Sequence, residues 1–308
     1  MELADHAPRR KGTGGPVPVY YSPAYISGDY AFDTTRKSGW IADSLAARPI
    51  EGLELVAPAP ATADQLSRVH TRAYVEAVRT GEPPERAEGN GFSWDPGLWT
   101  TTTASTGGVI EAARQAIERG TAGSLSSGLH HAKRDHGDGF CTFNGLAVAA
   151  DVALEAGIGG VLVLDLDAHC GGGTAQLLGD DDRVIQVDIA TSAFDSYPAA
   201  KRWTFDYIRQ AGQYLPTLRS RLADLDTTGI GLLLYNAGMD PSEVSMGGLG
   251  GMTSEVLAER EETVFAWAKE RDLPVAFVLA GGYSGPGLSR AGLVDLHRLT
   301  LEAAVRNA

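Results

Sequence analysis

Metal-binding side chains occur at two places in the sequence, each directly after an apolar run. Asp165, Asp167 and His169 are spaced two apart, so an extended chain places all three on one face. One of these carboxylates and the imidazole, joined by Asp240 after another apolar run, would bind a cation and leave one position open. Because Zn²⁺ accepts this set of nitrogen and oxygen ligands, the pattern predicts a catalytic divalent-metal site.

An alternative role for these aspartates is to cap the N-terminus of the following helix, which aspartate often does. That role does not suit Asp165, because it lies inside the apolar run 160–166, where an unpaired carboxylate is costly. A bound cation would offset this cost. The metal site therefore remains the stronger prediction.

Two adjacent histidines and a tyrosine could supply the remaining groups for catalysis. His130 and His131 could both face a cleft, one as a base and one as an electrostatic partner, or they could form a solvated pair. Tyr283 follows two glycines and could project its hydroxyl as an oxyanion donor, although it could also be an ordinary loop tyrosine. Cys141 is expected to be a packed cysteine rather than a nucleophile. A metal, a base and a tyrosine together predict a metal-dependent amide hydrolase.

The apolar runs that precede these residues predict strands buried on both faces of a sheet. The expected strands are 17–21, 160–166, 184–189, 231–235 and 274–279, with a shorter run at 121–126. The expected helices are 106–120, 144–156, 201–224 and 253–271, and 81–97 is expected to be a long surface loop. Alternating strands and helices predict one α/β domain with a parallel sheet flanked by helices. The candidate side chains follow four strands, so we expect them at one edge of that sheet.

Composition limits the kinds of partner. The chain of 308 residues has 39 acidic and 26 basic residues, and its net charge of −13 argues against binding to nucleic acid or to an anionic membrane surface. Two cysteines favour a reducing, cytoplasmic location, and neither a secretory signal nor a membrane-spanning run is apparent. Residues 1–12 are expected to form a flexible arm and 13–308 the catalytic domain. A homo-oligomer is compatible with the sequence.

The order of the motifs resembles that of the zinc-dependent histone deacetylase superfamily, which includes bacterial acetylpolyamine amidohydrolases and acetoin-utilisation-type proteins. The motifs are GLHHAK at 128–133, GFCTFN at 139–144, LDLDAH at 164–169, AGMD at 237–240 and GGY at 281–283. The string Asp-Leu-Asp-Ala-His is closest to the class IV deacetylases. The resemblance implies an arginase-like parallel α/β fold and one Zn²⁺ per chain, with the possibility of a structural K⁺.

The resemblance also implies roles for individual residues. The implied zinc ligands are Asp167, His169 and Asp240, and the implied catalytic residues are Tyr283, His130 and His131, with His131 as the general base. Asp165 would orient His130, and the potassium site would involve Asp165, Asp167, His169 and Asp188. The acyl-lysine tunnel would be lined by Gly139 and Phe140, with Tyr197 opposite them and Met246 beside them.

Two positions depart from the pattern of the superfamily. Most members have a second histidine where this chain has Cys170, and an aspartate or asparagine where it has Gly172. In those members the side chain at the second position pairs with the second tandem histidine. Because Gly172 has no side chain, we expect His131 to lack this partner.

These observations predict a zinc-dependent amidohydrolase that removes an acyl group from an amine such as acetyl-lysine, an acetylpolyamine or a small metabolite. One alternative is a metal-binding homologue with impaired catalysis, which Gly172 alone supports. Another is a manganese-dependent ureohydrolase. That class needs the order Asp-x-His-x-Asp and a second Asp-x-Asp pair, whereas this chain has Asp-x-Asp-x-His and a single Asp240.

Overall fold

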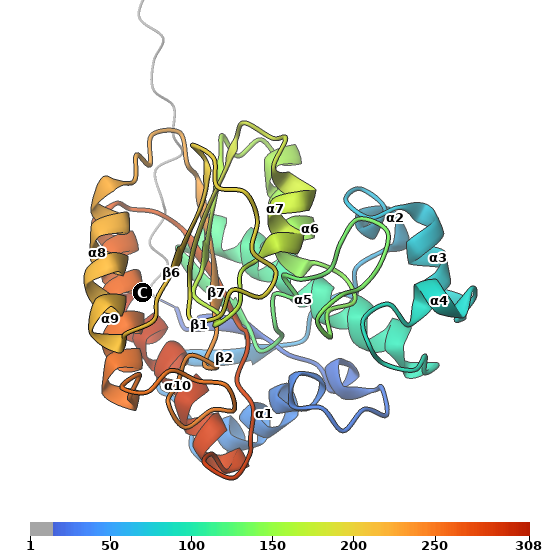
Figure 1. Cartoon of the computed structure of the whole chain (residues 1–308), viewed down its shortest axis with the longest axis horizontal. Coiled ribbons are helices and arrows are strands. Elements are labelled where there is room, and N and C mark those ends of the chain that lie inside the picture. The colour runs from blue at the N-terminus through green and yellow to red at the C-terminus, as the bar shows by residue number, and fades with distance from the viewer. Residues whose placement is uncertain (1–14) are drawn as a thin grey trace, which may run out of the picture.

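A parallel sheet of eight strands runs through the protein, which a computed structural model describes over residues 15–308 (Figure 1). The strand order is β2-β1-β3-β8-β7-β4-β5-β6, and every neighbouring pair is parallel. The strands are β1 (Val17–Tyr20), β2 (Leu53–Val56), β3 (Thr121–Ser124), β4 (Val161–Asp165), β5 (Val184–Ala190), β6 (Trp203–Tyr207), β7 (Leu232–Ala237) and β8 (Val275–Leu279).

Helices cover both faces of the sheet (Figure 1). On one face lie α1 (Lys37–Ala47), α8 (Tyr214–Asp224), α9 (Ser254–Glu270) and α10 (Arg290–Asn307). On the other face lie α5 (Gly97–Arg119), α6 (Gly145–Glu155) and α7 (Gly172–Leu178), with α2 (Ala63–Leu66), α3 (Arg72–Thr80) and α4 (Pro84–Ala87) outside them. Short 3₁₀ turns are η1 (Pro23–Ile26), η2 (Asp33–Thr35) and η3 (Ala211–Gln213).

The central strands are apolar along their whole length because each of their faces packs against a layer of helices. In β4, Leu162 and Leu164 belong to the core with α8, α9 and α10, whereas Val161 and Val163 belong to the core with α5 and α6. Each fully buried leucine stabilises the fold by about 2 kcal/mol. This packing confirms the predicted parallel α/β sheet flanked by helices.

The secondary structure differs from the sequence-based expectation in several places. The single helix expected over 201–224 is wrong, because this segment forms the edge strand β6, the turn η3 and then α8. The strand β6 lies at the edge of the sheet, where most of its residues are only partly buried. Its sequence therefore includes polar residues and lacks the continuous apolar run that marks the central strands. The expected loop 81–97 contains the short helix α4, and β2, α1, α3 and α10 were not anticipated. The expected flexible arm, residues 1–12, lies outside the described residues.

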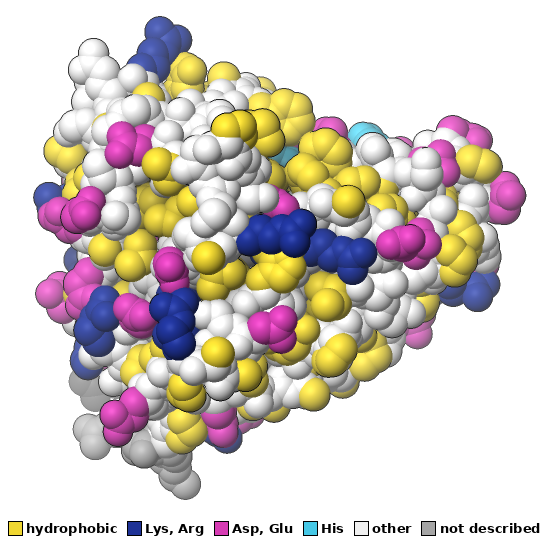
Figure 2. Space-filling view, turned by 90° about the horizontal axis from the view of Figure 1, so that it is seen from below, with side chains coloured by type: hydrophobic (Ala, Val, Ile, Leu, Met, Phe, Trp, Pro, Cys, Tyr) yellow, Lys and Arg dark blue, Asp and Glu magenta, His cyan; other side chains and the backbone are white. Residues whose placement is uncertain are grey.

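Four strands that precede the candidate residues, β3, β8, β7 and β4, are direct neighbours in the sheet. Their carboxyl ends therefore deliver the following loops to one place, as expected from the sequence. No helix among the described residues is long and apolar enough to cross a membrane. On the face that Figure 2 shows, acidic and basic side chains are interspersed rather than gathered into a patch of either sign.

Candidate active site

Three side chains beyond the ends of β4 and β7 place their ligand atoms together. Asp167, His169 and Asp240 each offer one atom, and these atoms lie within 4.8 Å of one another. His169 Nδ1 is 3.1 Å from Asp167 Oδ1 and 3.1 Å from Asp240 Oδ2. These are the three residues that the resemblance implied as metal ligands.

Backbone groups hold the two carboxylates in place. Gly281 N donates to Asp167 Oδ2 at 2.7 Å, and Ala168 N donates to Asp240 Oδ1 at 3.0 Å. Asp240 Oδ2 is buried and accepts no hydrogen bond, although it lies close to the imidazole of His169. One oxygen of each carboxylate is thus held by a backbone N–H, and another oxygen of each faces the imidazole.

The charges at this cluster fit a bound cation. Burial alone would lower the pKa of His169, but Asp167 and Asp240 raise it to about 11. The cluster therefore strongly favours a positive charge at Nδ1. A divalent metal would supply that charge in place of the proton, and one nitrogen with two carboxylate oxygens suits Zn²⁺.

The first tandem histidine, His130, is held by a carboxylate of the sheet itself. Asp165, the last residue of β4, accepts a hydrogen bond from His130 Nδ1 to Oδ2 at 2.6 Å. Asn236 of β7, which pairs with Asp165 in the sheet, donates to Asp165 Oδ1 at 2.8 Å. Burial alone would lower the pKa of His130, but Asp165 and Asp167 raise it to about 9. The two carboxylates thus favour the charged form of His130.

The second tandem histidine has a carboxylate partner, which corrects the expectation drawn from Gly172. His131 Nδ1 lies 2.8 Å from Asp195 Oδ2, and Asp195 comes from the loop after β5. The other carboxylate oxygen of Asp195, Oδ1, pairs with the ammonium group of Lys133. Burial and the neighbouring charge of His130 nevertheless lower the pKa of His131 to about 4. A neutral imidazole thus lies beside a charged one, with 3.1 Å between their Nε2 atoms.

Tyr283 lies beside the cluster because two glycines let the chain pass close to the carboxylates. A Cβ atom at Gly281 would lie 2.4 Å from the Asp240 carboxylate and 2.5 Å from Asp167 Oδ2, so only glycine fits there. Tyr283 N donates to Ser245 Oγ at 3.2 Å, which fixes the start of the turn. Burial raises the pKa of the Tyr283 phenol well above its usual value, so the hydroxyl keeps its proton.

A cleft of about 330 Å³ opens above these groups and is lined by aromatic side chains. The ring of Phe32 packs at a tilt against Phe140, with ring centroids 4.4 Å apart, and against Tyr283 at 5.3 Å, forming one wall. On the opposite side, Phe194 lies edge-on to His131 with the ring centroids 4.9 Å apart. The full lining is Phe32, His131, Gly139, Phe140, His169, Phe194, Met246 and Tyr283. The cleft therefore has largely apolar walls and reaches the polar cluster at His131 and His169.

Comparison with known proteins assigns this arrangement to a family. Residues 32–224, more than half of the chain, match the family of the histone deacetylase domain. The chain belongs to the histone deacetylase family. The matched span includes the tandem histidines, Asp167 and His169, whereas Asp240 and Tyr283 lie beyond it.

Individual relatives agree with this assignment. Histone deacetylase 2 of Arabidopsis thaliana is 29% identical over 279 residues, which cover 80% of this chain and 70% of the relative. The crystal structure of the HDA15 HD domain superposes with a TM-score of 0.78 at 17% identity, covering 96% of this chain and 90% of that chain. The acetylpolyamine aminohydrolase of Burkholderia pseudomallei gives 0.77 at 18% identity, covering 94% and 99%. The predicted deacetylase-like fold is confirmed, and deacetylase-family relatives support an amide hydrolase.

Of the four residues expected to line the tunnel, the structure places three in the cleft of this histone deacetylase family member and one outside it. Gly139, Phe140 and Met246 line the cleft, whereas Tyr197 does not. The Tyr197 hydroxyl donates to the Thr204 carbonyl at 3.0 Å, and its ring packs against Phe205 of the edge strand. The expectation for Tyr197 is therefore corrected. Phe194, three residues earlier, is the aromatic of this loop that lines the cleft.

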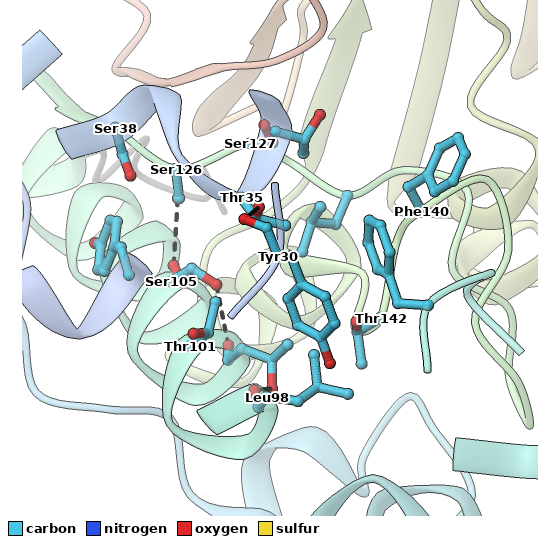
Figure 3. Close-up of a pocket in the computed structure, with 15 residues that line it drawn as sticks. Tyr30, Thr35, Ser38, Leu98, Thr101, Ser105, Ser126, Ser127, Phe140 and Thr142 are labelled. Atoms are coloured by element: carbon cyan, nitrogen blue, oxygen red, sulfur yellow. Dashed lines mark hydrogen bonds between the residues drawn. The ribbon is translucent and has the colours of Figure 1, made fainter. Parts of the chain in front are cut away.

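Beneath the cleft, a narrow polar space continues into the protein. The space beside His130, His131 and Tyr283 measures only about 20 Å³. It shares Thr34, Ser127 and Leu129 with an internal pocket of about 40 Å³. Figure 3 shows hydroxyl groups lining this pocket from α5, which carries Thr101 and Ser105, and from the loop after β3. Such a lining offers hydrogen bonds to water or to another small polar molecule.

Asp188 occupies a buried position next to the end of β4. It pairs with Asp165 in the sheet register, and its carboxyl group accepts hydrogen bonds from Gly171 N and Gln186 Nε2 at 2.6 and 2.9 Å. Burial raises the pKa of Asp188 well above its usual value, and the nearby Asp165 adds to this rise. The structural potassium ion expected at this end of β4 stays a prediction.

Sequence reasoning missed three residues at the site. Asn236 of β7 is one of them, and it holds the carboxylate of Asp165. Phe194 and Asp195 follow β5, which is the direct neighbour of β4. The position of β5 next to the metal-bearing strand is the signal that could have brought the loop after it into the site.

Proposed function

We propose that this chain is a zinc-dependent deacylase that removes an acyl group from an amine. Membership of the histone deacetylase family supports amide hydrolysis, and the convergence of Asp167, His169 and Asp240 is the single observation that carries the metal assignment. The pairing of a neutral and a charged histidine beside this cluster supports proton transfer there. The cytoplasmic location and a homo-oligomer remain predictions of the sequence.

Each group of the site has a chemical role in this proposal. When bound, Zn²⁺ would polarise the amide carbonyl and lower the pKa of a water molecule. His131 is neutral and would accept the proton of the attacking water, whereas His130 is charged and would stabilise the developing negative charge. Tyr283 keeps its phenolic proton and would donate a hydrogen bond to the oxyanion.

The cleft supports a substrate with an unbranched apolar chain next to the amide. Phe140 and Phe194 both line the cleft, and Met246, which also lines it, is 65% exposed. The methylene groups of a lysine or of a polyamine suit such walls, because both burial and aromatic contact favour them. We therefore propose an acylated amine as substrate, such as acetyl-lysine, an acetylpolyamine or a small metabolite.

The structure removes the one argument for the alternative that this chain is a homologue with impaired catalysis. That reading depended on the absent side chain at Gly172, and Asp195 supplies a carboxylate to His131 in its place. A two-metal ureohydrolase is also disfavoured. Among residues 15–308, the cluster of Asp167, His169 and Asp240 is the one group of three or more side chains suited to a metal.

The test is hydrolysis of a panel of acetylated amines by the zinc-loaded protein. The panel includes an acetyl-lysine peptide, acetylputrescine, acetylspermidine and simple N-acetyl amides. We expect turnover of at least one member, lost on chelation and restored by zinc. The Asp182→Asn variant, which changes an exposed acid away from the site, serves as the control and should behave as wild type. Absence of turnover across the panel with zinc bound would count against the proposal.

A further inference from the structure

We infer that Asp195 is the positioning carboxylate of His131, delivered by the loop after β5 into space that Gly172 leaves free. The inference rests on the proposed function in that His131 is taken as the proton acceptor. It concerns a residue outside every motif that carries the family resemblance. Asp195 acts through His131 and does not itself reach the cleft, so it is a positioning residue.

The contacts of Asp195 are those of a buried, fully used carboxylate. Its Oδ2 atom accepts from His131 Nδ1 at 2.8 Å and from Gly173 N at 3.2 Å, and its Oδ1 atom accepts from Lys133. The side chain is only 10% exposed. Burial alone would raise the pKa of Asp195, but its hydrogen bonds with His131 and Lys133 lower it, so the carboxylate stays ionised.

Gly172 has no side chain because the Asp195 loop occupies the space that one would need. A Cβ atom at Gly172 would lie 2.2 Å from the Asp195 backbone oxygen and 2.3 Å from its Oδ1 atom. Both distances are far below any real contact, and the first involves backbone, which cannot turn aside. A side chain at position 172 and the present position of Asp195 thus exclude each other.

The second unusual position, Cys170, belongs to the same arrangement. Cys170 is fully buried, its Sγ atom lies 3.8 Å from the Ser192 carbonyl, and its N–H donates to the Phe194 carbonyl at 3.1 Å. Ser192 N in turn donates to the Ala168 carbonyl at 2.7 Å. The loop therefore packs directly on the segment that carries the ligand His169. The residues at both unusual positions, 170 and 172, thus lie directly against the loop that carries Asp195.

The backbone of Asp195 is held in a conformation that an aspartate adopts at a cost. Its φ angle is +57°, in the left-handed region where non-glycine residues are uncommon. Such a conformation persists when the surroundings fix it, and it is often found at functional sites. Here it turns the carboxylate inward to His131, while the preceding Phe194 forms the wall of the cleft.

The chemical consequence concerns which nitrogen of His131 carries its proton. An ionised carboxylate can only accept, so Nδ1 of His131 donates to Asp195 and the lone pair lies on Nε2. Nε2 is the atom that lies 3.1 Å from His130 Nε2, and His131 is one of the residues that line the polar space beneath the cleft. Without Asp195, the ring would be free to rotate and to change tautomer. We therefore expect the loss of Asp195 to affect turnover more than substrate binding.

The experiment compares zinc-loaded Asp195→Ala, Asp195→Asn and Gly172→Ala with the Asp182→Asn control on one acetyl amide. Asp195→Ala should lower kcat roughly 10–100-fold at a nearly unchanged KM, as loss of an orienting partner typically does. Asp195→Asn retains an oxygen that accepts from His131 and should recover most of this loss. Gly172→Ala should displace the loop and also lower kcat. Combining it with Asp195→Ala should add little, because both changes remove the same contact.

Wild-type kcat in folded, zinc-loaded Asp195→Ala would overturn the inference, as would full additivity of Asp195→Ala and Gly172→Ala. A structural role alone would lower kcat in Asp195→Asn and Asp195→Ala equally, which would also contradict it. An NMR measurement separates this inference from the proposed function. The hydrogen-bonded Nδ1 proton of His131 should give a downfield resonance in the wild type that is absent in Asp195→Ala, whether or not any acetyl amide is hydrolysed. A resonance unaffected by Asp195→Ala would reject the pairing itself.

Discussion

The two histidines of the site are paired with carboxylates that reach them in different ways. Asp165 is the last residue of a central strand, is 1% exposed, and is held by Asn236 of the next strand. Asp195 lies on a loop, with a left-handed backbone, and is held by a lysine and a backbone N–H. The first carboxylate is thus fixed by the sheet, and the second by the packing of a loop against it.

Their surroundings give the two imidazoles opposite charges although each has a carboxylate partner. Asp165 and Asp167 overcome the effect of burial and raise the pKa of His130 to about 9. At His131, burial and the charge of His130 outweigh Asp195, and the pKa falls to about 4. The comparison shows that a His–carboxylate pair does not by itself set protonation. The number of neighbouring charges decides which histidine stores a proton and which can accept one.

The largest effect is expected from loss of the metal cluster, because both His–carboxylate pairs are proposed to act together with the metal. Asp240→Ala removes one of two buried carboxylates that face His169, so metal binding and turnover should both be lost. Metal analysis of the purified variant together with its activity measures this. Full activity in Asp240→Ala would mean that the histidine pairs work without the metal site.

The next largest effect is expected at the tyrosine. Tyr283→Phe should lower kcat by roughly 10²–10³-fold with a modest change in KM, because one oxyanion donor is lost. Steady-state kinetics of the zinc-loaded variant test this expectation. If kcat stays near that of the wild type, the charged His130 alone stabilises the oxyanion and Tyr283 has no part in it.

Stability should distinguish the two carboxylates from each other. Asp165→Ala removes the carboxylate that accepts from His130 Nδ1 and Asn236 Nδ2 at the buried end of β4, so it should reduce the free energy of unfolding by roughly 3–5 kcal/mol. Asp195→Ala should reduce it by only about 1–2 kcal/mol, because Asp195 lies on a loop and its side chain is less deeply buried than that of Asp165. Urea denaturation of both variants measures the difference. Equal losses would show that the loop supports the fold as much as the strand does.

A smaller effect concerns His70, a buried histidine whose protonation should make the stability of the fold depend on pH. His70 is 2% exposed, its Nδ1 atom donates to the Lys133 carbonyl, and its Nε2 atom accepts from Asn144 N. Burial lowers the pKa of His70 to about 4, so the unfolded chain binds the proton first as the pH falls below about 6.5. Stability should therefore drop between pH 6.5 and 4, by about 3 kcal/mol from this group.

The matched variant for this prediction is His70→Gln, whose amide can replace both hydrogen bonds but does not titrate. Unfolding free energies of the wild type and the variant are compared at pH 7 and pH 4. The wild type should lose about 3 kcal/mol more than the variant over this range. Parallel losses in the two proteins would show that His70 does not carry the pH dependence.

The part of the site next to β4 could be predicted from the sequence, because Asp165, Asp167 and His169 come together at the end of an apolar strand. Asp165 is the last residue of β4, whereas Asp167 and His169 lie in the bend that follows it, so the end of the strand rather than an extended spacing places them. The position of β7 beside β4 explains why Asp240 joins them. The position of Asp195 could not be predicted in this way. It depends on where a loop packs, and neither a period nor a motif records the left-handed turn or the space at Gly172. The expectation for Tyr197 was wrong for the same reason. Phe194 lines the cleft, whereas Tyr197, three residues later in the same loop, packs against Phe205 of the edge strand β6.

The central claim is that one metal ion held by Asp167, His169 and Asp240 drives amide hydrolysis with the two histidines. The most direct measurement is titration of the metal-free protein with zinc while turnover of an acetyl-lysine amide is followed. We predict no turnover without metal and a proportional rise that stops at about one zinc per chain, as expected for a single site with three protein ligands. Full turnover in the metal-free protein, or a requirement for two ions per chain, would contradict this account.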